Sequence, residues 1–184
     1  MNHPLMAIPQ VSRKRLFWAL FIFTIVVMYC MNLVGEPLNT SEAPYGIVSY
    51  ELAGTVDQAQ VILDSWDQNA RLHAAFSLGF DYLFMALYST TIALACIWGA
   101  QLLPTRGWPG ARIGFLLAWG LWLAAILDGI ENVALSLELF GGPVAPWPQV
   151  AQTTAIVKFS LIFLGLSFSF VALIVKLWKR PVSQ

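Results

Sequence analysis

Four long apolar segments constrain the fold of this chain more than any other feature. They cover residues 16–34, 74–101, 113–140 and 150–178. An α-helix rises 1.5 Å per residue, so about 20 apolar residues cross the 30 Å hydrocarbon layer of a membrane. Only 11% of the 184 residues are charged, against about 25% in soluble domains. The sequence therefore predicts an all-α integral membrane protein, folded over residues 1–184 as a single bundle of four transmembrane helices.

The basic residues are distributed unevenly around these segments. Eight of the ten Lys and Arg residues lie in the N-terminal arm, in the loop between the second and third segments, and in the C-terminal tail: Arg13, Lys14, Arg15, Arg106, Arg112, Lys176, Lys179 and Arg180. Short cytoplasmic loops and tails carry the excess of Lys and Arg in membrane proteins. We therefore predict a multi-pass protein of the cell membrane with both termini in the cytoplasm and an extracytoplasmic loop over residues 35–73.

The loop over residues 35–73 is acidic and contains one predicted helix. Its acidic residues are Glu36, Glu42, Glu51, Asp57, Asp64 and Asp67. Thr55 and Gln58 fit the capping box that begins a helix, and apolar residues recur near helical spacing at Leu52, Val56, Ala59, Leu63 and Trp66. Helices that lie on anionic lipid are usually rich in Lys and Arg. We therefore expect this short amphipathic helix to rest on the outer end of the bundle, as a structural cap or as a mobile lid.

Aromatic residues gather near both predicted membrane boundaries, as they do in interfacial belts. The inner belt is predicted to contain Trp18, Trp98, Trp108 and Trp178. The outer belt is predicted to contain Tyr45, Tyr50, Trp66 and Trp147.

Four charged residues lie well inside the apolar segments, away from their ends: Asp81, Asp128, Glu131 and Lys158. Each costs roughly 2.5–3.5 kcal/mol at the centre of a membrane helix, so such residues are usually paired, buried or functional. At about 100° per residue, Asp128 and Asn132 share one arc of their helix with small residues, and small faces are where membrane helices meet. We expect the charges to face into the bundle, in one polar layer of the outer leaflet.

This layer is the predicted ligand-binding site, and it comprises Asp81, Tyr88, Asp128, Glu131, Asn132 and Lys158. Three carboxylates against one ammonium leave a formal charge of −2, so an acid must be protonated or a cationic ligand must complete the site. We expect Glu131 to face a pocket below the helix at 55–66 and to bind the polar or cationic end of an apolar ligand.

The alternative interpretation of this layer is structural. Lys158 would then pair with Asp128 or Asp81 and fix the register of the helices. Three further groups would support that pair: Asn132, Tyr88 and Thr154.

Residues needed by several common reaction centres are missing. Neither cysteine lies in a CxxC redox motif, and the chain contains no HExxH, Glu-x-x-His or GxSxG motif. No cofactor and no resident metal are therefore predicted, with an oxygen-only divalent-cation site from Asp81, Asp128 and Glu131 kept as an alternative. The basic segment Arg13–Arg15 is interpreted as a topology signal, so no nucleic-acid partner is expected.

Three classes of function fit the sequence. The first is a non-catalytic membrane protein that binds lipids or a partner, and it requires nothing that the sequence lacks. The second is a membrane enzyme acting on a lipid or isoprenoid-like substrate, with Glu131 or Asp128 as acid or base and Lys158 as modulator. The third is a proton- or cation-coupled transporter. The expected partners are membrane lipids, a small apolar or cationic ligand, and further copies of the chain in an oligomer.

Overall fold

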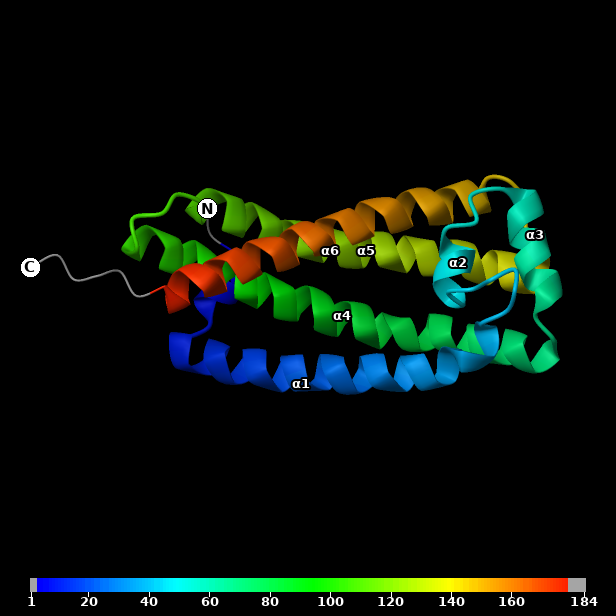
Figure 1. Cartoon of the computed structure of the whole chain (residues 1–184), viewed down its shortest axis with the longest axis horizontal. Coiled ribbons are helices and arrows are strands. Elements are labelled where there is room, and N and C mark those ends of the chain that lie inside the picture. Colours follow the sequence, from blue (N-terminus) through cyan, green and yellow to red (C-terminus); the bar gives the residue numbers. More distant parts are fainter. Residues whose placement is uncertain (1–2, 179–184) are drawn as a thin grey trace, which may run out of the picture.

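A computed structural model describes residues 3–178, and it contains helices and connecting loops with no strand among those residues (Figure 1). Its elements in chain order are the 3₁₀ helix η1 (Pro4–Ala7), α1 (Gln10–Gly35), the 3₁₀ helix η2 (Glu36–Leu38), α2 (Ile47–Glu51), α3 (Val56–Ser65), α4 (Gln68–Thr105), α5 (Ala111–Gly141) and α6 (Trp147–Leu177).

The four long helices α1, α4, α5 and α6 are each long and apolar enough to span a membrane. They cover the four segments predicted from the sequence except for Trp178, and each helix begins before its predicted segment. α4, for example, begins at Gln68, six residues before position 74. The cause is a local cap, because Asp67 Oδ1 accepts a hydrogen bond from the backbone N–H of Ala70 at 2.7 Å.

Helices α4, α5 and α6 pack against one another, whereas α1 packs mainly along α4 (Figure 1). The contact between α4, α5 and α6 requires small residues. A methyl group added at Gly114 of α5 would lie 2.7 Å from the Phe168 ring of α6 and 2.8 Å from Cβ of Ala100 in α4. Only glycine therefore fits where these three backbones approach, as expected at contacts between membrane helices.

One end of the bundle is closed by η2, α2 and α3, and we call residues 36–66 the cap (Figure 1). The predicted helix after Thr55 is confirmed, since the hydroxyl of Thr55 accepts a hydrogen bond from Gln58 N–H at 3.2 Å. The cap has its own apolar core with the bundle, formed by Leu38, Ala43, Tyr50, Ala59, Ile62, Leu63, Trp66, Ala70, Ala74, Leu78, Ala134, Leu135, Leu139 and Ala151.

Two aromatic residues expected in an interfacial belt lie inside this core instead. Tyr50 is 1% exposed and its hydroxyl donates to the carbonyl of Leu135. Trp66 is 3% exposed and its indole N–H donates to the carbonyl of Leu38. A buried Tyr or Trp needs such a partner for its polar atom, so both residues hold the cap together rather than marking a membrane surface.

The N-terminal arm packs against the half of the bundle away from the cap, where Leu5 shares an apolar core with Leu94 and Leu121. His3 is buried, and its ring packs against both Trp119 and Trp122 at centroid distances of 4.8 and 4.6 Å. Burial lowers the pKa of His3 below its ordinary value. Arg13, which belongs to the predicted topology signal, is buried as well, with Nη1 3.1 Å from Met6 Sδ.

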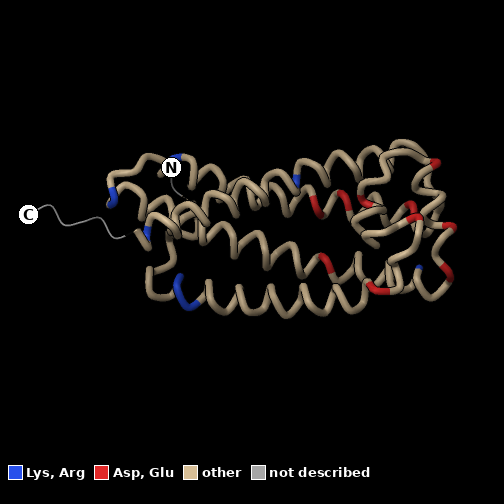
Figure 2. Tube along the Cα trace, in the orientation of Figure 1, with Lys and Arg blue, Asp and Glu red and all other residues tan. Residues whose placement is uncertain are grey.

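Charge is segregated between the two ends of the bundle (Figure 2). The acidic residues lie in the cap and in the half of the bundle next to it. Six basic residues of the described chain lie at the other end, namely Arg13, Lys14, Arg15, Arg106, Arg112 and Lys176. Two more from the predicted cytoplasmic set, Lys179 and Arg180, lie outside the described residues.

Candidate functional site

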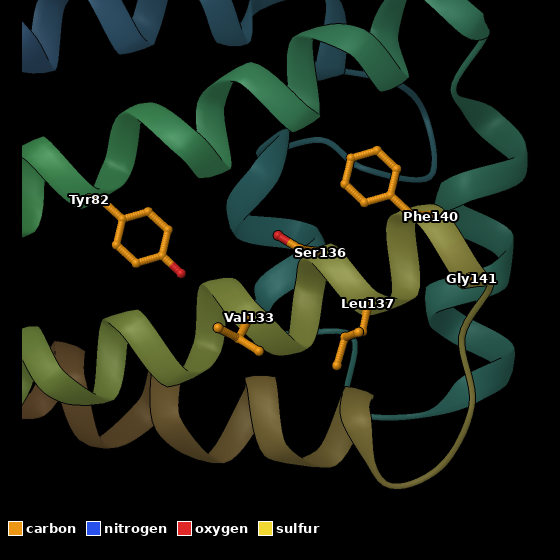
Figure 3. A pocket seen from close by; sticks show the side chains of 6 residues that line it. All are labelled: Tyr82, Val133, Ser136, Leu137, Phe140 and Gly141. Carbon is orange, nitrogen blue, oxygen red and sulfur yellow. The ribbon is translucent and has the colours of Figure 1, made fainter.

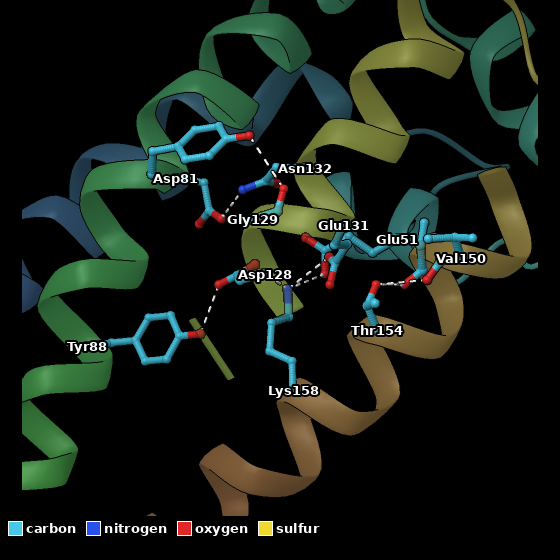
Figure 4. Close-up of polar contacts among 12 residues, drawn as sticks. Glu51, Asp81, Tyr88, Asp128, Gly129, Glu131, Asn132, Val150, Thr154 and Lys158 are labelled. Carbon is cyan, nitrogen blue, oxygen red and sulfur yellow. Dashed lines mark hydrogen bonds and ion pairs between the residues drawn. The ribbon is translucent and has the colours of Figure 1, made fainter. Parts of the chain in front are cut away.

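Lys158 is the centre of a cluster of buried charges (Figure 4). Its Nζ lies 2.8 Å from Oδ1 of Asp128 and 2.8 Å from Oε1 of Glu131. The three side chains are between 0 and 5% exposed. These are short charge-assisted hydrogen bonds, and they join α5 to α6 within the interior of the bundle.

The helical period explains why α5 presents both acids to one lysine. Asp128 and Glu131 are three residues apart, which places their side chains on neighbouring parts of one helix face. Lys158 lies on the α6 face that also carries Ala151, Ala155 and Gly165, and all of these are buried. The sequence prediction that the charges face into the bundle along small residues is confirmed for this pair of helices.

Helix α4 joins the cluster through Tyr88. The Tyr88 hydroxyl donates to Oδ2 of Asp128 at 2.9 Å, so both oxygens of that carboxylate have partners. Tyr88 is 5% exposed. Asp128 is therefore held from two sides, by an ammonium on α6 and a phenol on α4.

The cap contributes a third acid that the sequence analysis did not assign to the site. Oε2 of Glu51, the last residue of α2, lies 3.5 Å from Lys158 Nζ, and the Glu51 side chain is 12% exposed. In the sequence, Glu51 is one of six acids in the same loop, and no spacing pattern separates it from the others. Only the tertiary position of α2, set by the buried Tyr50 beside it, brings it to Lys158.

Asp81 forms a separate pair within the predicted layer. Its Oδ2 accepts a hydrogen bond from Asn132 Nδ2 at 2.7 Å, and no ion pair joins it to Lys158 within 4.0 Å among the described residues. Of the two predicted alternatives, Lys158 therefore pairs with Asp128 and not with Asp81. Thr154 does not support the lysine either, because its hydroxyl donates to the carbonyls of Val150 and Ala151 in its own helix.

The cluster contains more negative than positive charge. Glu51, Asp128 and Glu131 face one ammonium, and Oε2 of both glutamates is buried without a hydrogen-bond partner among the described residues. Burial raises the pKa of Glu51 above its ordinary value of 4.5, while the charge of Lys158 opposes that rise. Since isolated carboxylates are expensive to bury, the arrangement favours retention of at least one proton.

A further buried acid, Glu138, lies on α5 two turns closer to the cap than Glu131. It is 1% exposed and neither carboxylate oxygen has a hydrogen-bond partner among the described residues. Tyr50 contacts the same helix, since its hydroxyl donates to the carbonyl of Leu135, three residues before Glu138. The seven-residue spacing from Glu131 could have indicated the shared helix face, but Glu138 was not selected from the sequence.

An open hollow of about 550 Å³ lies on the surface between α4 and α5 (Figure 3). It is lined by Tyr82, Val133, Ser136, Leu137, Phe140 and Gly141. None of the predicted site residues is among them, and Glu131 is fully buried against Lys158. The described residues also contain no group of three His, Cys, Asp or Glu side chains arranged to hold a metal ion.

Comparisons of the chain with models of protein families, with curated proteins and with solved structures found no match. The class of this protein is therefore assigned from its fold and from the geometry of the site. The described residues form an all-helical bundle with four helices compatible with transmembrane spans, closed at one end by a packed cap.

Proposed function

We propose that this chain is a non-catalytic integral membrane protein that binds lipids or a protein partner, with both termini in the cytoplasm and the cap outside. In this proposal the Lys158 cluster fastens the cap to the bundle. The observation that carries it is the position of Lys158 Nζ, which contacts carboxylates from both α5 and the cap while the side chain is 5% exposed.

The surface of the bundle supports the membrane part of the proposal. Large apolar side chains are exposed along all four long helices, including Phe21, Phe76, Ile126 and Phe163 at 40 to 69% exposure. A soluble protein rarely exposes contiguous apolar surface of this extent. The segregated charges in turn support the orientation, because Lys and Arg mark cytoplasmic loops and tails.

The packing around the cluster favours a structural role over catalysis. A general acid or base must lie within hydrogen-bonding reach of the proton that it transfers in the substrate. Glu131 is fully buried, and both Asp128 and Glu131 already bind Lys158. The hollow between α4 and α5 is lined by other residues. The ligand-binding role of the predicted site residues stays a prediction.

One observation favours a second candidate, a proton-coupled transporter. Three acids around one ammonium favour a retained proton, and a proton that can be released is what a coupled transporter requires. The two candidates differ in one measurable property, because a fastening cluster keeps its proton whereas a transporter exchanges it across the membrane.

Proteoliposomes with an imposed pH gradient separate the two candidates. We expect no proton flux above that of empty vesicles for the wild-type protein. The variants Glu131→Gln and Glu138→Gln form a matched pair, since both acids are buried on α5 and only Glu131 contacts Lys158. Flux in the wild type that disappears in Glu131→Gln and persists in Glu138→Gln would support the transporter.

Mass spectrometry of the protein purified in native lipid tests the binding part of the proposal. We expect the wild type to retain a selected lipid or a protein partner, and both glutamine variants to retain it equally. A wild-type protein that retains neither would contradict the proposal. A small molecule lost from Glu131→Gln alone would instead indicate a ligand site at the cluster.

A further inference from the structure

A second hollow lies at the end of the bundle opposite the cap. Its volume is about 370 Å³, and it is lined by Arg106, Trp108, Val171, Ile174, Val175 and Trp178. Three of these residues are aliphatic and belong to α6. The other three are one cation and two tryptophans placed at the ends of α4 and α6. The groove therefore has an apolar part formed by α6 and a part that contains the cation Arg106.

The local backbone explains how the groove forms. α4 ends at Thr105, and the chain turns back so that Trp108 N–H donates to the carbonyl of Leu103 at 3.0 Å. Gly107 adopts a φ of 71°, a left-handed conformation that glycine tolerates best. Below this turn, Val175 packs with Leu103 and Phe168 in a small core, which gives the groove an apolar floor.

Arg106 forms no ion pair with an acidic side chain among residues 3–178. The sequence contains no Asp or Glu between residues 82 and 127, after residue 138, or before residue 36. The ion pairs of the described residues involve Arg71 and Lys158, both outside this groove. The acid-free end therefore favours an anion and offers no carboxylate to a positively charged headgroup.

We infer that this groove binds an anionic phospholipid of the cytoplasmic leaflet, with its phosphate at Arg106 and an acyl chain along Val171 and Ile174. Trp108 and Trp178 are 47% and 69% exposed, and such aromatic side chains favour the headgroup level of a membrane. The inference rests on the proposed membrane insertion and orientation. A zwitterionic lipid fits less well, because its ammonium would meet only basic residues.

Native mass spectrometry of the full chain, released from nanodiscs of phosphatidylcholine with a minor share of phosphatidylglycerol, tests this inference. We expect selective retention of phosphatidylglycerol, weakened about fivefold by Arg106→Gln, the loss expected for one basic contact to an anionic lipid. The matched control is Arg112→Gln, because Arg112 follows the same loop, is exposed and does not line the groove. This control should retain the lipid at close to the wild-type level.

A second pair of variants tests the apolar part without changing charge. Val171→Trp fills the groove, and it should reduce phosphatidylglycerol retention. Leu173→Trp adds the same bulk at a nearby exposed position outside the groove and should leave retention unchanged. Equal losses for Arg106→Gln and Arg112→Gln, or no preference for phosphatidylglycerol over phosphatidylcholine, would overturn the inference. A protein that is absent from the membrane fraction would instead overturn the proposed function.

Discussion

Replacing Lys158 by methionine tests the Lys158 cluster most directly. Methionine keeps a long apolar side chain but removes the ammonium that lies 2.8 Å from two carboxylates and 3.5 Å from a third. Removing one partner of a buried pair costs about 3–5 kcal/mol. Protonating one carboxyl of ordinary pKa about 4 at pH 7 costs about 4 kcal/mol, which gives the same scale. We expect the free energy of unfolding to fall by about 3–5 kcal/mol.

A second substitution separates pairing from general damage. Adding Asp128→Asn to Lys158→Met removes one of the carboxylates left without a cation, and the new amide can still accept from Tyr88. This double variant should recover about 2 kcal/mol, half of the expected loss. Asp81→Asn is the matched control, because the hydrogen-bond partner of Asp81 is Asn132 and not Lys158. Its effect should add to that of Lys158→Met without any recovery.

Unfolding of the purified variants in mixed detergent micelles, followed by circular dichroism, measures these differences. The two single aspartate variants complete each double-mutant cycle. Lowering the pH should shrink the Lys158→Met deficit by about 1.4 kcal/mol per unit for each stranded carboxyl, because protonation becomes less costly. Equal recovery by Asp81→Asn and Asp128→Asn, or a deficit independent of pH, would refute the pairing.

Three further predictions follow from other parts of the structure. A cysteine placed at position 57, in a chain whose two native cysteines are replaced, should react with a membrane-impermeant reagent in intact cells. A reporter fused after Gln184 should be cytoplasmic. Labelling of the cysteine only after permeabilisation would show that the orientation is the reverse. Because burial raises the pKa of Glu51, docking of α2 should be complete below about pH 4.5 and weaken as the pH rises through the raised value. Hydrogen-exchange protection of α2 should therefore fall in the wild type as the pH rises through the raised pKa of Glu51 and stay constant in Glu51→Gln. Gly114→Ala should destabilise the bundle by about 1–3 kcal/mol through overpacking, whereas Gly79→Ala, with no atom within 4 Å of the added methyl, should not lower the melting temperature in detergent.

The sequence predicts the long helices well because their apolar length dominates every other signal. The angular position of each residue around its helix is equally informative. It correctly predicts that Asp128, Glu131 and Lys158 lie in the interior. The capping residue Thr55 likewise identifies α3, because an N-cap is a local interaction that a few neighbouring residues determine.

The cap and the full composition of the cluster could not be predicted, because they depend on contacts between distant segments. Glu51 and Lys158 are joined only when α2 settles on the end of the bundle. Asp81 and Lys158 were expected in the same polar layer, yet the side chain of Asp81 on α4 binds Asn132 instead. Tyr50 and Trp66 are residue types that are common in interfacial belts, but the tertiary packing of the cap buries both of them.

The position of Lys158 near the end of the chain has a consequence for biosynthesis. Asp128 and Glu131 leave the ribosome 30 and 27 residues ahead of their cation. Each acid alone would raise the cost of placing α5 in lipid by roughly 2.5–3.5 kcal/mol. Only residues 142–146 separate α5 from α6, so in the proposed membrane topology the two helices would enter the bilayer as one hairpin with the charges already matched. The cap is translated early, but its Glu51 meets Lys158 only after that hairpin is in place, so closure of the cap is a late step of assembly.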